Sequence, residues 1–129
     1  MASPQPNNTQ EDCDTFNERC KQQIDEALEI AKTLFTKMDD DGIAHIVFMG
    51  PFYVLGLNAA IDYGYTRLDE ICTQNTQIDC YVVDTRPVDP EKPADGDHVH
   101  PSPEGYRQLA RAIWDVIIDN NIPLATLYA

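Results

Sequence analysis

Residues 44–49, Ala-His-Ile-Val-Phe-Met, are a continuous apolar run with turn-forming residues on both sides. Gly42 precedes the run, and Gly50-Pro51 ends it. A short apolar run bounded in this way is typical of a strand that is buried on both faces, as the strands of parallel sheets are. This run constrains the fold strongly, because a parallel sheet needs helices on both of its faces. His45, near the start of the run, is interpreted as a structural histidine rather than a ligand.

Segments with helical spacing of apolar residues lie before and after this strand. We expect one helix over residues 12–38, ended by an aspartate run, and another over residues 56–73. Residues 79–84 predict a second strand, and residues 103–119 predict a final helix. This order predicts a βαβ unit with an extra helix in front, in which the strands pair in parallel through a right-handed crossover. The sequence therefore predicts an α/β fold with a short parallel sheet flanked by helices.

The length of 129 residues is enough for one domain and too short for two. We expect a polar, disordered lead-in at residues 1–11, a domain at residues 12–122 and a short tail at residues 123–129. The net charge of −13 argues against nucleic acid or an anionic membrane as a partner, because both require clustered lysine and arginine. We also expect no membrane span and no signal peptide, because no apolar run approaches roughly 20 residues and the start lacks an apolar region.

Four cysteines lie at positions 13, 20, 72 and 80. Cys72 and Cys80 bracket a polar loop that a disulfide could close. Cys13 and Cys20 would be separated by about 10.5 Å of rise on one continuous helix, which exceeds the roughly 7 Å limit for a bridge. A disulfide between them therefore requires the helix to start after Cys13. Cysteine at this density favours an oxidising compartment, such as the periplasm or the extracellular space, whereas the expected lack of a signal peptide argues against it.

Several side chains follow the ends of the two predicted strands, where open α/β sheets bind their ligands. Phe52 and Tyr53 come shortly after the first strand and are expected either to line a pocket or to join the core. Asp84 ends the second strand and is expected either to cap the next loop or to face the site.

The stretch from Asp97 to His100, which leads into the final helix, carries the strongest signal for chemistry. Ser102 is expected to be the N-cap of that helix, with Pro103 in its first turn, where a missing N–H costs nothing. A carboxylate that orients a histidine base makes up two of the three groups of a nucleophilic triad. Asp97 and His100 are therefore the candidate catalytic pair.

The run D-x-x-H-P-x-x-x-G-Y-x-x-L-A, from Asp97 to Ala110, resembles the last sequence block of the SGNH (GDSL) hydrolases. The order of elements before it is similar to the C-terminal half of that family's fold. The resemblance implies a partial three-layer, flavodoxin-like fold and assigns the catalytic roles to Asp97 and His100. It also implies esterase or acylhydrolase chemistry on an ester, acyl or carbohydrate-acetyl substrate, with no cofactor.

The family's Gly-Asp-Ser, oxyanion-glycine and Gly-x-Asn-Asp blocks do not occur in this sequence, whose serines are Ser3 and Ser102. Neither serine follows a predicted strand. We therefore expect a chain that is truncated relative to the family and inactive alone, because it lacks the nucleophile. Two strands also leave a sheet edge open, and an open edge favours pairing with another chain. A second copy or a complementary N-terminal segment is the expected partner.

Two other interpretations remain open for the same stretch. Asp95, Asp97, His98 and His100 form a group of carboxylate and imidazole ligands that suits zinc, although their spacing matches no strong metal signature. Alternatively, Asp97 braces the loop and His100 bonds to the backbone, and the chain is a non-catalytic module that pairs through its open sheet edge.

Overall fold

The computed structural model describes residues 9–51, 56–74, 77–88 and 101–123. Two helices come first, α1 (Thr9–Asp14) and α2 (Glu18–Asp40), followed by the strand β1 (His45–Met49). The helix α3 (Asn58–Thr73) leads to the strand β2 (Asp79–Val83), and α4 (Pro103–Asp119) is the last helix. The expected strand and helix order is confirmed from β1 onward, and the final helix has the expected bounds.

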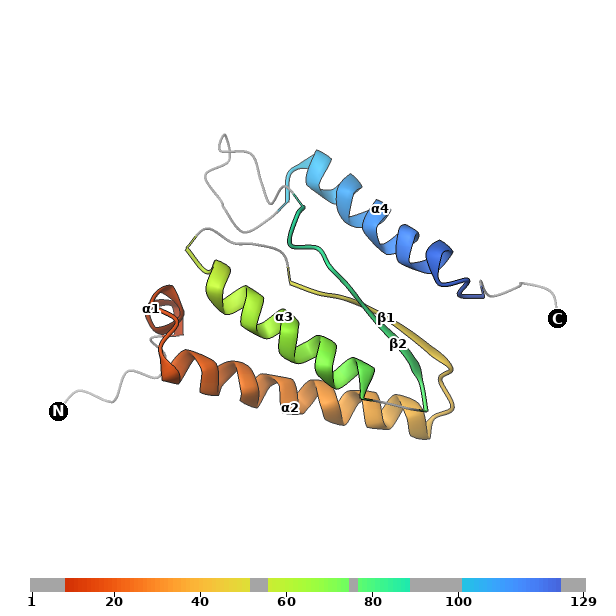
Figure 1. The fold of residues 1–129 in the computed structure, drawn as a ribbon, viewed down its shortest axis with the longest axis horizontal. Coiled ribbons are helices and arrows are strands. Elements are labelled where there is room, and N and C mark those ends of the chain that lie inside the picture. Colours follow the sequence, from red (N-terminus) through yellow and green to blue (C-terminus); the bar gives the residue numbers. More distant parts are fainter. Residues whose placement is uncertain (1–8, 52–55, 75–76, 89–100, 124–129) are drawn as a thin grey trace.

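The described elements form three layers (Figure 1). The strands β1 and β2 lie between the α2–α3 pair on one side and α4 on the other, and α4 contacts both strands. The two strands pair in parallel, in a register that runs from His45 opposite Asp79 to Met49 opposite Val83. The prediction of an α/β fold with a short parallel sheet flanked by helices is therefore confirmed.

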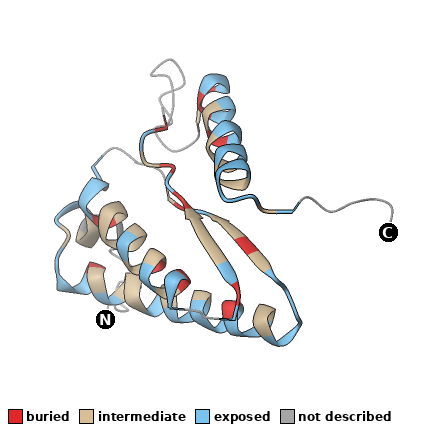
Figure 2. Cartoon of the chain, turned by 45° about the vertical axis from the view of Figure 1, so that its right-hand side comes forward, coloured by how far each residue is buried: buried red, intermediate tan, exposed pale blue. Residues whose placement is uncertain are grey.

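The hydrophobic core lies between the sheet and the α2–α3 pair. Its buried members are Phe35 from α2, Ile46 from β1, Leu68 and Cys72 from α3, and Ile78 just before β2. Figure 2 shows the helices exposed along much of their outward surface, with buried residues on the sides that face the strands. In α4, on the other side of the sheet, Gly105 and Leu109 are buried. Both faces of the sheet are therefore covered, and the cluster of buried hydrophobic residues lies on the α2–α3 side.

The prediction of one continuous helix over residues 12–38 is wrong. The chain breaks between α1 and α2 at Phe16, whose φ is 50°, and Asn17 then caps α2 by accepting a hydrogen bond from the backbone N–H of Cys20 at 3.0 Å. An asparagine side chain competes with helical backbone bonding and so favours a cap. The spacing of apolar residues does not reveal this break, because Phe16 and Cys20 are four residues apart, as they would be on a continuous helix.

This break allows Cys13 and Cys20 to form a disulfide with their Cα atoms 5.0 Å apart, because α2 starts after Cys13 as the spacing argument requires. A second disulfide joins Cys72, near the end of α3, to Cys80 in β2. Two disulfides in a chain of this size are typical of proteins that fold in an oxidising environment. The helix α1 begins at Thr9, so its first residues fall within the segment expected to be a disordered lead-in.

Two glycines have clear backbone roles. Gly42 has a φ of 82° just after α2, so the aspartate run at residues 39–41 is a helix terminus, as expected. Gly50 follows β1 in a close approach to β2, where a Cβ atom would lie 2.8 Å from the carbonyl oxygen of Val83. A side chain at Gly50 would therefore force the two strand ends apart.

We predict opposite effects for two glycine-to-alanine changes. Gly50→Ala should lower the free energy of unfolding by about 1–3 kcal/mol, because its Cβ meets backbone that cannot move independently. Gly64→Ala, within α3, should raise it by up to about 1 kcal/mol, since alanine favours helix and its Cβ would make an ordinary 3.8 Å contact with Ile24. Guanidinium unfolding measures both, and equal effects would contradict the close approach at Gly50.

We also predict that the double change Cys72→Ser, Cys80→Ser lowers the free energy of unfolding by about 2–3 kcal/mol, because the bridge restricts the unfolded chain. The measurement is guanidinium unfolding without reductant. Adding dithiothreitol should destabilise the unmutated chain further than the double variant, which retains one reducible bridge. Equal sensitivity of both proteins to the reductant would show that this bridge does not contribute.

Candidate functional site

The carboxyl ends of β1 and β2 are joined by buried hydrogen bonds. The hydroxyl of Thr85, which is 0% exposed, donates to the carbonyl oxygen of Gly50 at 2.7 Å. The backbone N–H of Gly50 donates to the carbonyl oxygen of Val83 at 3.1 Å. This edge is where ligands bind in open α/β sheets, so the candidate site has a rigid base.

The helix α4 starts with a buried cap. Ser102 is 2% exposed, and its hydroxyl oxygen accepts a hydrogen bond from the backbone N–H of Gly105 at 3.0 Å. The predicted N-cap is therefore confirmed. Because this hydroxyl is buried and occupied as a cap, Ser102 is unsuited to be a nucleophile. Ser3, the other serine, lies outside the described residues.

The candidate catalytic residues Asp97 and His100 lie outside the described residues, as do Asp95 and His98 of the alternative metal loop. Their mutual geometry therefore stays a prediction. Val88, the last described residue before this segment, is buried and donates its backbone N–H to the carbonyl oxygen of Thr85 at 3.1 Å. After the segment, Pro101 is half-buried and Ser102 is buried. The expectation that Phe52 and Tyr53 line a pocket also falls outside the described residues.

Sequence reasoning missed a polar cluster around Arg86, which follows β2. The guanidinium Nε and Nη2 donate to the two carboxylate oxygens of Asp84 at 2.8 and 2.9 Å, and Nη1 donates to Asp62 of α3 at 3.1 Å. The guanidinium carbon also lies 4.0 Å from the ring centre of Tyr65. A positive charge held in this way braces the strand end against α3.

The carboxylate of Asp84 also accepts a hydrogen bond from the backbone N–H of Arg86 at 3.1 Å. Asp84 therefore caps the loop after β2, which is one of the two roles expected for it. The side-chain hydrogen bonds from Arg86 hold the pKa of Asp84 below its ordinary value, and burial raises the pKa of Tyr65. The spacing of Asp84 and Arg86 could have suggested a local pair, but Asp62 and Tyr65 become neighbours only through the crossover.

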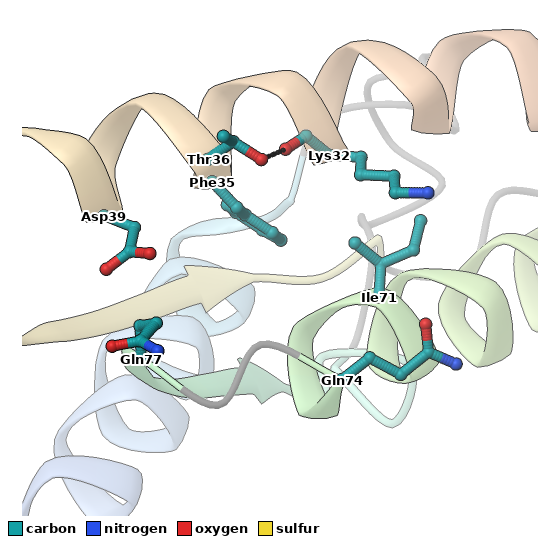
Figure 3. A pocket seen from close by; sticks show the side chains of 7 residues that line it. All are labelled: Lys32, Phe35, Thr36, Asp39, Ile71, Gln74 and Gln77. Atoms are coloured by element: carbon teal, nitrogen blue, oxygen red, sulfur yellow. Dashed lines mark hydrogen bonds between the residues drawn. The ribbon is translucent and has the colours of Figure 1, made fainter.

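The opposite, amino edge of the sheet carries different groups. A cavity of about 330 Å³ lies there, and Figure 3 shows Lys32, Phe35 and Asp39 of α2 facing Ile71 and Gln74 of α3 across it. At the same edge, Nδ1 of His45 lies 3.4 Å from a carboxylate oxygen of Asp79, its cross-strand neighbour. This contact agrees with a structural role for His45. The described lining of the cavity contains no pairing of a nucleophile with a base.

A second cavity, of about 520 Å³, lies at the carboxyl edge, and its surface is mostly apolar. It is bordered by Pro51 and by the first turns of α3, and residues from α1 and α2 line it as well. Its lining includes Cys13, Ile24, Pro51, Leu57, Ala60 and Ile61.

Among the described residues, no group of three or more histidine, cysteine, aspartate or glutamate side chains is arranged to hold a metal ion. No described helix combines the length and apolar character needed to cross a membrane.

A comparison with protein families agrees with the motif at the start of α4. The family model described as GDSL-like Lipase/Acylhydrolase matches residues 4–113, which include the run from Asp97 to Ala110. No curated protein and no solved structure matched the chain.

We predict that Arg86→Met raises the pKa of Asp84 back toward its ordinary value and lowers the free energy of unfolding at neutral pH by about 1–2 kcal/mol. A carboxyl whose pKa is depressed by folding contributes stability above its unfolded-state pKa and loses it as the pH falls through its folded-state pKa. The stability difference between the two proteins should therefore shrink in acid. Carboxyl NMR titration and unfolding at several pH values test this.

The matched control is Arg107→Met, which removes an exposed ion pair with Glu104. We expect it to change the free energy of unfolding by less than about 0.5 kcal/mol. If the difference in the free energy of unfolding between the unmutated chain and Arg86→Met does not depend on pH, then Arg86 does not stabilise the ionised form of Asp84.

Proposed function

Because the chain belongs to the GDSL-like lipase/acylhydrolase family, we propose that it supplies the Asp97–His100 part of a serine esterase site. The family implies ester substrates. The observation that carries the proposal is the family match across the Asp97–Ala110 block. The helix α4, which contains the end of this block, starts beside the carboxyl end of β2 (Figure 1).

In this proposal His100 is the general base. It takes the proton of a serine hydroxyl as the oxygen attacks the ester carbonyl, and it returns that proton to the leaving alcohol. Asp97 holds the imidazole in orientation and stabilises the imidazolium that forms. Water then releases the acyl group from the serine by the same base catalysis.

The serine and the oxyanion donors come from outside these 129 residues. Two features support this part of the proposal: the Gly-Asp-Ser block does not occur in the sequence, and Ser102 is occupied as a helix cap. Removing one oxyanion donor alone typically lowers the rate by roughly 10²–10³. A chain that lacks these groups should hydrolyse esters close to the uncatalysed rate.

The described surface has places where a complementary segment could pack. Among the described residues, β1 pairs on one side only, and Met49 at its end is 47% exposed. On α4, Tyr106, Trp114 and Ile118 are 49–55% exposed and recur at helical spacing. An N-terminal segment of the same polypeptide or a second chain could cover these groups. The two disulfides favour the periplasm or the extracellular space as the compartment.

We predict that p-nitrophenyl acetate is hydrolysed at the uncatalysed rate in the presence of the chain alone. Mixing the chain with an N-terminal segment from the same source that carries a Gly-Asp-Ser block should restore catalysed hydrolysis. His100→Ala in the mixture should lower kcat by at least roughly 10⁴-fold, since removing a triad base has effects of this size. Hydrolysis by the mixture that is insensitive to His100→Ala would refute the proposed role.

The pairing of Asp97 with His100 can be tested in the chain as it stands. A downfield imidazole N–H proton of His100 should be visible by NMR, lost in Asp97→Asn and retained in the control Asp95→Asn. If instead zinc binds with a heat signal that both variants reduce, the metal-loop interpretation replaces the catalytic one.

A further inference from the structure

We propose that a second copy of this chain packs antiparallel against the outward face of α4 and forms a symmetric dimer. The inference goes beyond the proposed function and does not rest on it. It is carried by the exposed side chains of the helix, by the distribution of charge along it and by a hollow in its surface. The exposed residues of the outward face are Arg107, Ala110, Arg111, Trp114, Asp115 and Ile118.

The outward face of α4 points away from the sheet. The helix contacts β1 and β2, and its buried residues are Gly105 and Leu109. Trp114 follows Gly105 by nine residues, or about two and a half helical turns, so it lies on the opposite side of the helix. It is 49% exposed, and Ile118, one turn later, is 54% exposed. Because tryptophan is enriched at the centres of protein interfaces, this face is suited to a protein partner.

The charge of the chain favours a second copy as that partner. The net charge of −13 makes most surfaces of two copies repel each other. The helix α4 carries two arginines and three acids, a net charge of −1, so little repulsion arises there. A basic partner, by contrast, would be attracted to the acidic surfaces elsewhere on the chain.

The charges on α4 are also divided between its two halves. Arg107 and Arg111 lie in the first half, where Arg107 already pairs with Glu104, and Asp115 and Asp119 lie in the second. Antiparallel copies place the arginine half of each helix against the aspartate half of the other, whereas parallel copies would bring like charges together. A contact between Arg111 of one copy and Asp115 of the other then occurs twice, related by a two-fold axis.

A hollow on the outward face provides a seat for the tryptophan of the second copy. It has a volume of about 680 Å³, and Arg107, Ala110, Arg111, Trp114 and Asp115 line it. The small side chain of Ala110 leaves space above the helix. When Arg111 of one copy lies opposite Asp115 of the other, Trp114 of each copy faces this hollow. Its ring can stack there on the guanidinium group of Arg111 of the other copy.

The size of the face predicts a weak dimer. The 17 residues of α4 form a helix about 25 Å long. One face of such a helix buries less surface than the roughly 800 Å² per partner of a stable complex, so we expect a Kd on the order of 10–100 µM. This dimer does not use β1, which among the described residues pairs on one side only. It therefore differs from the pairing through an open sheet edge that the sequence suggests.

The test is sedimentation of the full chain from about 1 µM to about 1 mM with its disulfides intact, a range that spans the expected Kd. We expect a reversible equilibrium between monomer and dimer. Trp114 is the single tryptophan of the chain, so its emission should shift to the blue as the dimer forms. A chain that stays monomeric throughout would overturn the proposal. If an N-terminal segment from the same source then shifts the emission instead, that segment is the partner of this face.

Trp114→Ser should weaken the dimer at least about thirtyfold, because a central tryptophan is lost from both copies. Its circular dichroism spectrum should not change, since the side chain faces solvent in the monomer. The matched control is Ile30→Ser, because Ile30 is 72% exposed on α2; this variant should dimerise as the unmutated chain does. A dimer that Trp114→Ser leaves equally tight would place the interface elsewhere and overturn the proposal.

Charge reversal tests the antiparallel arrangement. Arg111→Asp and Asp115→Arg each place like charges opposite one another, so each variant alone should dimerise about tenfold more weakly or worse. For Asp115→Arg this loss cannot come from general repulsion, because the variant is less negative than the unmutated chain. An equal mixture of the two variants should form a heterodimer about as tight as the unmutated dimer, because opposite charges then meet at both contacts. A mixture that associates no better than the separate variants would refute the arrangement.

Discussion

The parallel pairing of β1 with β2 is the interaction on which the other features of this structure depend. Five residues of each strand pair in register, and the connection between them must cross one face of the sheet, which it does through α3. The pairing ends in the close approach of Gly50 to Val83 and in the buried bond from Thr85 to the carbonyl oxygen of Gly50. These contacts hold both strand ends at one edge, beside the start of α4.

The two faces of the sheet are covered unequally. The side packed by α2 and α3 has a continuous core, in which the ring of Phe35 meets that of Phe48 with centroids 5.6 Å apart. On the other side, α4 buries little of its surface and exposes Trp114. Two disulfides lie on this side, and each joins one helix of the α2–α3 pair to a neighbouring element: Cys20 of α2 to Cys13 of α1, and Cys72 of α3 to Cys80 of β2. The exposed side is where a complementary segment would have the most apolar surface to cover.

The two edges of the sheet also differ in character. The amino edge has a polar cavity and the His45–Asp79 contact, whereas the carboxyl edge combines the Arg86 brace, the apolar cavity and the capped start of α4. In the Arg86 cluster one guanidinium donates hydrogen bonds to two carboxylates, those of Asp84 and Asp62, and so holds the end of β2 against α3. The proposed catalytic block that contains Asp97 and His100 belongs to the segment that the family model matches.

Local patterns in the sequence were sufficient for much of the fold. The apolar run at residues 44–49 and the Ser102-Pro103 cap predicted β1 and the bounds of α4, because strand burial and helix capping depend on neighbouring residues. The Asp97–Ala110 block indicated the family because its motif is contiguous in the sequence. The break at Phe16 was missed, since helical periodicity continues across it. The pairing of Arg86 with Asp62 and the cavity beside Pro51 depend on segments that are distant in the chain, so only packing of α3 against the sheet and α2 decided them.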